Sequence, residues 1–403
     1  MPNYQGVWSL STQYQAIGDQ NWPMAPGAPT SVSAAAGNTQ ATVSFTAPSF
    51  TGVPAGVTGY LATSDPDGVT KTGSASPLTV TGLTNGTSYT FTVQATNGIQ
   101  YGPAGTSGGV TPAVLQRILY FGGNSGSNIN VIEYIDPSST GNGTDFGDML
   151  LVGRDDGGVG SNTRAVLAAN AVLSYVEFAS TGNATDFGDL NFSVGNMAGA
   201  GSNTRGLFVG GSYNNIDYIT IANTGNATDF GNLSGVSDDT AGALASATRA
   251  VIGKVGTANG AGTSQLMVYV TIANTGNSTD FGTLSGGTRK QNLEGASSST
   301  RGLFAGGYRS YPSTVYYNNI EYITIASTGD TSDFGDLNAG LDGGAFGSGA
   351  TRAVFAGGYN GSTSNNVMQY VTIATTGNTT DFGDLTASKV GMGAASSVHG
   401  GNV

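Results

Sequence analysis

Apolar and polar positions follow two different patterns along the chain. Between residues 26 and 112 they alternate with a period of two, as in TVSFT and YTFTVQA, and Gly, Asn and Pro interrupt the alternation. After this stretch, short apolar runs such as GLFAGG and YITIA recur at regular distances. Both patterns are typical of β-strands, because β-branched and aromatic residues favour strands and Gly, Asn and Pro favour turns. The sequence therefore predicts an all-β protein in two parts.

The second part contains six copies of one phrase, seen most clearly in RGLFAGGYRSYPSTVYYNNIEYITIASTGDTSDFGDL at 301–337. Each copy opens with an arginine, and successive arginines are 47, 41, 44, 52 and 51 residues apart. These arginines are Arg117, Arg164, Arg205, Arg249, Arg301 and Arg352. A Tyr-centred run follows each arginine, and then a turn leads to Asp-Phe-Gly. The period fits the four strands of a β-propeller blade.

Between copies lie segments of very small residues, such as GGVGSN at 157–162 and GGAFGSGA at 343–350. We expect them to be the innermost strands, where blades converge and only Gly, Ala and Ser fit. The first copy lacks such a segment, whereas residues 390–398 form one with no further copy after it. Pairing residues 390–398 with Ile118–Phe121 would complete the first blade and leave no free edge. We therefore predict six blades, closed by the C-terminal strand.

The repeats resemble the kelch family, best in ILYFGGNSGSNINVIEYIDPSSTGNGTDFGD at 118–148. The resemblance implies a β-propeller with Gly-Gly after the second strand, Tyr in the third and an aromatic residue in the fourth. Here Phe replaces the usual fourth-strand Trp, and the second and fourth copies lack Gly-Gly.

Residues 26–113 resemble a fibronectin type III domain, through alternating strands and the segment GLTNGTSY. The resemblance implies a β-sandwich in which Leu83 and Tyr89 form a tyrosine corner and Phe45 stands where a core Trp is common. The predicted organisation is thus an anchor segment (1–25), a fibronectin type III-like sandwich (26–113) and a six-bladed kelch-like β-propeller (114–403).

The anchor segment contains four large aromatic residues, which are Tyr4, Trp8, Tyr14 and Trp22. So short a segment cannot bury two indoles by itself. Either they contact the sandwich or they dock onto another protein. The segment GVWSLSTQYQAIGDQNWP, together with the STGNATDFGDL repeats, is similar to structural proteins of marine and cyanobacterial tailed phages. This similarity implies a virion protein docked through residues 1–25.

Composition narrows the classes of partner. The net charge is −12 and the chain has only 13 Lys and Arg, which argues against nucleic acid and against adsorption to anionic membranes. No 18-residue apolar stretch could span a bilayer, and the first basic residue is Lys71, unlike a conventional signal peptide. We expect a virion component made in the host cytoplasm, working on an extracellular particle.

Catalytic chemistry has few candidates. The chain has no Cys and one histidine, His399, which lies where other copies have Arg. Asp155–Asp156 and Asp238–Asp239 could supply paired carboxylates, but adjacent Asp residues in loops commonly stabilise turns. The sequence predicts no enzyme, no cofactor and no metal site.

Two residues of the repeat permit a structural or a functional interpretation. The repeated arginine is expected to bind backbone carbonyls or carboxylates of a neighbouring blade. The repeated aspartates could ligate calcium, but we favour side-chain hydrogen bonds to turn backbone. They are Asp145, Asp186, Asp229, Asp280, Asp333 and Asp381.

Binding is expected on one face of the propeller. Two sets of turns are nearly uniform among copies, whereas the loops on the other face vary widely, and variation in repeat proteins collects on the binding face. The loop at 308–319 is rich in tyrosine, and a neighbouring loop adds two cations. The candidate ligand-binding residues are Tyr308, Arg309, Tyr311, Tyr316, Tyr317, Arg289 and Lys290. The alternative is that these tyrosines only pack the loop against the blades.

The sequence thus predicts a non-enzymatic phage virion protein, of fibre, tail or capsid, that attaches to a host-surface glycan or protein. A purely architectural protein without a ligand and a bacterial surface lectin or glycan hydrolase are the alternatives.

Overall fold

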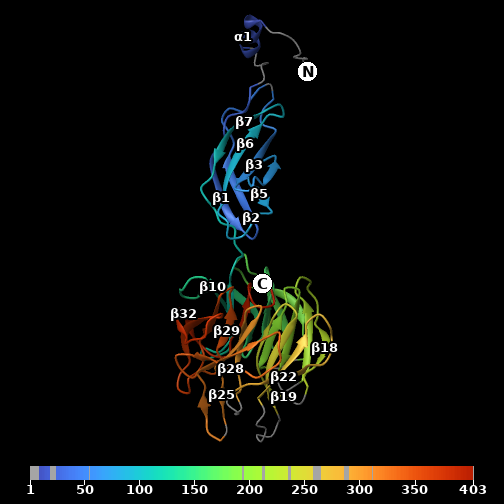
Figure 1. Cartoon of the computed structure of the whole chain (residues 1–403), viewed down its shortest axis with the longest axis vertical. Helices are drawn as coiled ribbons and strands as arrows, with labels where there is room; N and C mark the ends of the chain where they lie inside the picture. Colours follow the sequence, from blue (N-terminus) through green and yellow to red (C-terminus); the bar gives the residue numbers. More distant parts are fainter. Residues whose placement is uncertain are drawn as a thin grey trace. The chain divides into compact units, whose positions relative to one another are not determined.

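The computed structural model describes residues 9–18, 24–53, 55–192, 195–210, 214–234, 237–256, 265–285, 290–310 and 312–402. The chain divides into two compact units, Met1–Val114 and Leu115–Val403 (Figure 1). Nearly all of the described secondary structure is β-strand, and the single described helix is α1 (Leu10–Gly18). That helix is too short to span a membrane.

The first unit is a sandwich of two antiparallel sheets. One sheet has the order β1 (Thr30–Gly37), β2 (Gln40–Thr46), β5 (Leu78–Thr81). The other has the order β4 (Thr70–Gly73), β3 (Gly59–Asp65), β6 (Thr90–Thr96), β7 (Tyr101–Thr106). Alternate residues of these strands face a common core, in which Phe45 contacts Tyr60. The buried Tyr89 hydroxyl donates to Asp67 at 2.6 Å and accepts from the Thr84 backbone at 3.1 Å, which is the geometry of a tyrosine corner.

The second unit consists of six four-stranded antiparallel sheets, numbered here along the chain. Their strands follow from innermost to outermost: sheet 1, β33 (Gly393–Ser396), β8 (Ile118–Phe121), β9 (Ile129–Ile135), β10 (Thr144–Gly153); sheet 2, β11 (Gly158–Gly160), β12 (Arg164–Ala169), β13 (Val172–Glu177), β14 (Thr185–Asp189); sheet 3, β15 (Met197–Gly201), β16 (Arg205–Gly210), β17 (Asn215–Thr220), β18 (Thr228–Asn232); sheet 4, β19 (Ser237–Ala245), β20 (Arg249–Gly256), β21 (Gln265–Thr271), β22 (Thr279–Thr283); sheet 5, β23 (Glu294–Ser297), β24 (Arg301–Ala305), β27 (Asn319–Thr324), β28 (Ser332–Asp336); sheet 6, β29 (Ala345–Ser348), β30 (Arg352–Ala356), β31 (Asn365–Thr372), β32 (Thr380–Lys389). A two-stranded hairpin, β25 (Tyr308–Arg309) and β26 (Val315–Tyr316), extends from the β24–β27 connection.

The C-terminal strand joins the first sheet, as the sequence predicts. Gly393 pairs with Phe121 and Ser396 pairs with Ile118 in an antiparallel register. Each of the six innermost strands contacts the next, and β29 of sheet 6 contacts β33 of sheet 1. Hydrophobic clusters follow the same cyclic order: each lies between two consecutive sheets, and one of them joins sheet 6 to sheet 1. Apolar side chains buried between neighbouring sheets therefore hold the second unit together.

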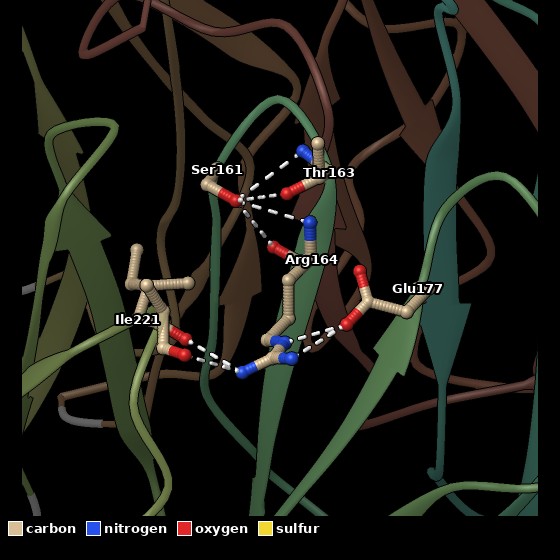
Figure 2. Close-up of polar contacts among 6 residues, drawn as sticks. Ser161, Thr163, Arg164, Glu177 and Ile221 are labelled. Atoms are coloured by element: carbon tan, nitrogen blue, oxygen red, sulfur yellow. Dashed lines mark hydrogen bonds and ion pairs between the residues drawn. The ribbon is translucent and has the colours of Figure 1, made fainter.

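The repeated arginines link consecutive sheets. Each guanidinium lies over the ring of the repeated tyrosine in its own sheet, with 4.3–4.7 Å between the guanidinium carbon and the ring centre. Arg205 Nη1 also donates to the carbonyls of Ile272 and Ala273 in sheet 4, at 2.8 and 2.9 Å. Figure 2 shows Arg164 donating to the carbonyl of Ile221 in sheet 3 and pairing with Glu177. The guanidinium can stack and donate at once because it is planar and carries several N–H groups.

Replacing Arg205 with lysine is expected to destabilise the second unit. An ammonium cannot both stack on Tyr218 and reach the two carbonyls. The free energy of unfolding should therefore fall by about 1–3 kcal/mol. Urea unfolding followed by circular dichroism measures the effect, and Arg309→Lys on the hairpin provides a control with the same chemical change. Equal midpoints for the two variants would contradict the linking role of Arg205.

The repeated aspartates do not make the predicted turn hydrogen bonds. All six aspartate side chains are exposed. Hydrogen bonds between neighbouring sheets are made instead by the residue three positions before each aspartate. For example, Asn226 Oδ1 accepts from the Asp189 backbone at 3.0 Å, across the boundary between sheets 2 and 3. Asn142 Oδ1 likewise accepts from Asp384 at 3.0 Å, which joins sheet 1 to sheet 6. The prediction chose the wrong residue because each aspartate is on a strand, where alternate side chains face solvent.

Candidate functional site

Two sets of loops meet on one face of the second unit. The β24–β27 connection carries the hairpin, and Tyr308 exchanges backbone hydrogen bonds of 2.8 and 3.0 Å with Gln291 from the segment that enters sheet 5. In sheet 6, Asp342 and Tyr359 make the equivalent exchange, at 2.8 and 3.0 Å. Figure 1 shows the hairpin at one end of this unit and the C-terminus at the other. We call the surface that carries the hairpin the loop face.

The loop face carries a cluster of three half-buried tyrosines. The rings of Tyr308 and Tyr316 are stacked, with centroids 6.2 Å apart, and Tyr316 contacts Tyr359 edge-on at 5.8 Å. Gly361 and Gly340 lie against Tyr316, and a Cβ on either would collide with it. Loops of two neighbouring sheets thus build one aromatic surface. Tyr359 was missed in the sequence, although it follows Gly-Gly as Tyr308 does.

The structure separates the other predicted ligand-binding residues. Lys290 is only 2% exposed and forms an ion pair with Glu321, so the prediction that it binds a ligand is wrong. Charged residues of loops are usually solvated, but the Lys290 ammonium lies over the ring of Tyr317, 5.2 Å from its centre. Arg309 is half-buried in the hairpin, where Nε donates to Ser313 at 3.4 Å. Tyr311 and Arg289 lie outside the described residues.

A narrow cavity opens at the centre of the loop face. It has a volume of about 70 Å³ and is lined largely by Gly and Ala, with residues from all six innermost strands or from the segments that enter them. A second cavity of about 60 Å³ continues along the same strands. Glycine is required here: a Cβ on Gly199 would collide with the backbone of Gly158 in the neighbouring sheet. The predicted innermost strands therefore line this passage.

Three carboxylates, Asp155, Asp156 and Glu294, line this cavity, and Asp342 interacts electrostatically with Asp155 and Glu294. Burial, followed by the charge of Asp155, raises the pKa of Asp156 to about 8. Burial and the charges of Asp155 and Asp342 raise the pKa of Glu294 well above its usual value. The pKa of Asp342 rises to about 6, mainly through burial, although a hydrogen bond from Asn292 opposes the rise. Of these groups, the sequence had indicated only the Asp155–Asp156 pair.

The C-terminal residues cross the opposite end of the passage. His399 Nδ1 accepts from the Gly401 backbone at 3.0 Å, so Nε2 is the protonated nitrogen and donates to the Gly160 carbonyl at 2.9 Å. Gly400 donates to Ser297 at 3.1 Å, and the Gly401 carbonyl accepts from Asn203 at 3.1 Å. Burial lowers the pKa of His399, which favours this neutral form. His399 therefore ties the tail to sheet 2, while its neighbours contact sheets 3 and 5.

Among the described residues, no three His, Asp or Glu side chains converge closely enough to ligate one ion directly. In α1, Tyr14 is 70% exposed and Leu10 is 71% exposed on the same helix face. Tyr4, Trp8 and Trp22 lie outside the described residues.

Residues 27–107 match the family model of the fibronectin type III domain. This match lies within the first unit and agrees with its two-sheet sandwich. No curated protein matches the chain.

Proposed function

We propose that this chain is a non-enzymatic phage virion protein that attaches to the host surface through the loop face of a six-bladed, kelch-like β-propeller. The cyclic contacts of the six sheets support the propeller. The resemblance of the N-terminal segment and of the repeats to tailed-phage structural proteins supports the virion assignment. In this proposal residues 1–25 dock onto another virion protein and the sandwich acts as a spacer.

The tyrosine cluster is the observation that carries the attachment proposal. Tyr308, Tyr316 and Tyr359 come from loops that differ among copies, yet they form one surface beside the acidic cavity mouth. Tyrosine offers a large contact area and a hydroxyl group at low entropic cost, which suits binding to glycans or proteins. The cavity, at about 70 Å³, is far below the roughly 300–1,000 Å³ of small-molecule sites. Surface attachment therefore fits this face better than hydrolysis inside the cavity.

Host-cell binding tests this proposal. Fluorescently labelled full-length chain is expected to bind marine cyanobacterial host cells, and the triple variant Tyr308→Ser, Tyr316→Ser, Tyr359→Ser should bind at least about tenfold more weakly, since interface tyrosines often contribute more than 1.4 kcal/mol. The matched control is Tyr101→Ser, which removes an exposed tyrosine of the sandwich.

The other outcomes discriminate between the remaining functions. Unchanged binding of a folded triple variant would contradict the choice of this face. Absence of binding by the unmodified chain would favour the architectural role, and release of reducing sugar from host polysaccharide would favour a hydrolase.

A further inference from the structure

Residues 399–402, which we call the tail, fit tightly across one end of the central passage. A Cβ on Gly401 would collide with the carbonyl of Gly201 in sheet 3, and a Cβ on Gly400 would collide with the carbonyl of Ala245 in sheet 4. Both positions of the tail therefore require glycine, because any side chain would push the tail away from the innermost strands. The tail is a fitted part of the second unit.

The imidazole of His399 joins the tail to sheet 2 in one protonation state only. Nδ1 accepts the N–H of Gly401 at 3.0 Å, while Nε2 donates to the carbonyl of Gly160 at 2.9 Å. The neutral ring satisfies both contacts, because it has one acceptor and one donor. A proton added to Nδ1 converts the acceptor into a second donor, which then faces the N–H of Gly401. Protonation therefore replaces a hydrogen bond within the tail with a repulsion between two donors.

The surroundings of the imidazole do not compensate for a positive charge. His399 lines the second cavity, and it is the one titratable residue among the described residues that line it. The others are Gly, Ala, Val, Leu, Phe and Ser from all six innermost strands. Without a carboxylate beside it, the ring loses solvation of its charged form, so burial lowers the pKa of His399 although the hydrogen bond to Gly160 opposes this effect.

We propose that His399 is an acid-sensitive latch, which holds the tail across the passage when it is neutral and releases the tail when it is protonated. The latch is complete above pH 6.5, the ordinary pKa of histidine, because the latched form favours the neutral ring. It is lost as the pH falls through the lower pKa of the latched form. Release frees the tail from the innermost strands and opens this end of the second cavity, whereas β33 keeps its pairing with β8.

Two measurements on the full-length chain test the latch. The chain has a single histidine, so one imidazole signal in a proton NMR titration reports its protonation without further assignment. We expect a pKa below that of the same histidine in a free peptide of residues 397–403. Hydrogen exchange of the tail, followed by mass spectrometry and corrected for the intrinsic effect of pH, should be at least about threefold faster near pH 5 than near pH 7.5.

His399→Gln is the matched variant, because its amide can donate to Gly160 but does not titrate. Exchange of its tail should be the same at both pH values. This comparison is needed because Asp342 on the loop face, whose pKa is about 6, titrates in the same range. If the variant leaves the tail unprotected at both pH values, the NMR titration of the unmodified chain decides by itself.

Three results would overturn the proposal. The first is a histidine pKa in the chain that equals or exceeds the pKa in the peptide. The second is tail exchange in the unmodified chain that does not respond to pH. The third is an equal response to pH in the unmodified chain and in the Gln variant, which would assign the effect to another titrating group.

Discussion

Deleting residues 390–403 is expected to unfold the second unit while the sandwich stays folded. The deletion removes β33 and therefore the whole inner edge of sheet 1, together with the buried side chains of Met392, Ala395 and Val398. It also removes two hydrogen bonds to other parts of the second unit. Ser396 Oγ accepts from the Ser348 backbone N–H at 3.0 Å, and Ser397 Oγ accepts from the Arg117 backbone N–H at 2.8 Å. Burial of Met and Val alone contributes about 3–6 kcal/mol, a large part of the stability of a typical domain.

Far-UV circular dichroism during urea unfolding measures this effect. Tryptophan fluorescence is unsuitable, because both tryptophans lie in the anchor segment. The transition of the sandwich serves as the internal control and should not move. A synthetic peptide of residues 390–403 should restore the lost transition, whereas the same peptide with Gly393→Val should not, since a Cβ at Gly393 collides with the ring of Phe121. An unchanged transition in the truncated chain would show that β33 does not hold sheet 1 together.

The internal repeat made the pairing of the C-terminal strand with Ile118–Phe121 predictable. Strand positions followed from the regular placement of Arg, Tyr and Phe, because every strand recurs six times and the copies agree. The small-residue segment at the C-terminus had no copy of its own to follow it, and only the first copy lacked such a segment. In the sandwich, the resemblance of GLTNGTSY to the fibronectin type III domain implied the tyrosine corner. The Tyr89 hydroxyl accepts from Thr84, five residues earlier, and donates to Asp67, which lies 22 residues earlier.

The functional face was harder to predict, because its residues meet through tertiary contacts. Glu294 lines the cavity and interacts electrostatically with Asp342, although the two residues belong to different sheets and neither belongs to the repeated phrase. Lys290 was expected to be exposed, but it forms a buried ion pair with Glu321, which lies 31 positions away. No periodicity in the sequence indicates such a partner. The assignment of turn hydrogen bonds to Asp instead of Asn failed for a local reason, since both residue types favour turns.

Replacing Lys389 with leucine is expected to cost about 3–5 kcal/mol, because it leaves the buried carboxylate of Glu133 without its cation. Lys389 is 2% exposed and Glu133 is fully buried, and the two form an ion pair between the last residue of β32 in sheet 6 and β9, the third strand of sheet 1. Without the lysine, Glu133 retains the hydrogen bond of 2.7 Å from the backbone N–H of Thr386. Urea unfolding of the second unit measures the loss.

Sheet 5 contains a matched pair that should be less sensitive. Glu321 pairs with Lys290 and also accepts from Asn319 at 2.7 Å, Thr331 at 2.6 Å and Ser285 at 2.9 Å. In sheet 1 the position of Thr331 is occupied by Gly143, which has no hydroxyl to offer. Lys290→Leu is therefore expected to destabilise the chain less than Lys389→Leu. The opposite order would contradict the view that neutral donors compensate for the missing cation.

Sheet 6 shows how the same place can be filled without charge. There Gln369 takes the position of Glu133 and Leu341 takes that of Lys389, and Gln369 Oε1 accepts from Asn338 at 2.8 Å and Thr379 at 2.6 Å. The double variant Glu133→Gln, Lys389→Leu reproduces this pair and should recover most of the stability that Lys389→Leu loses, because neutral or apolar replacements of buried ion pairs are often tolerated. If the double variant were as unstable as the single one, the lysine would act through its packing and not by neutralising Glu133.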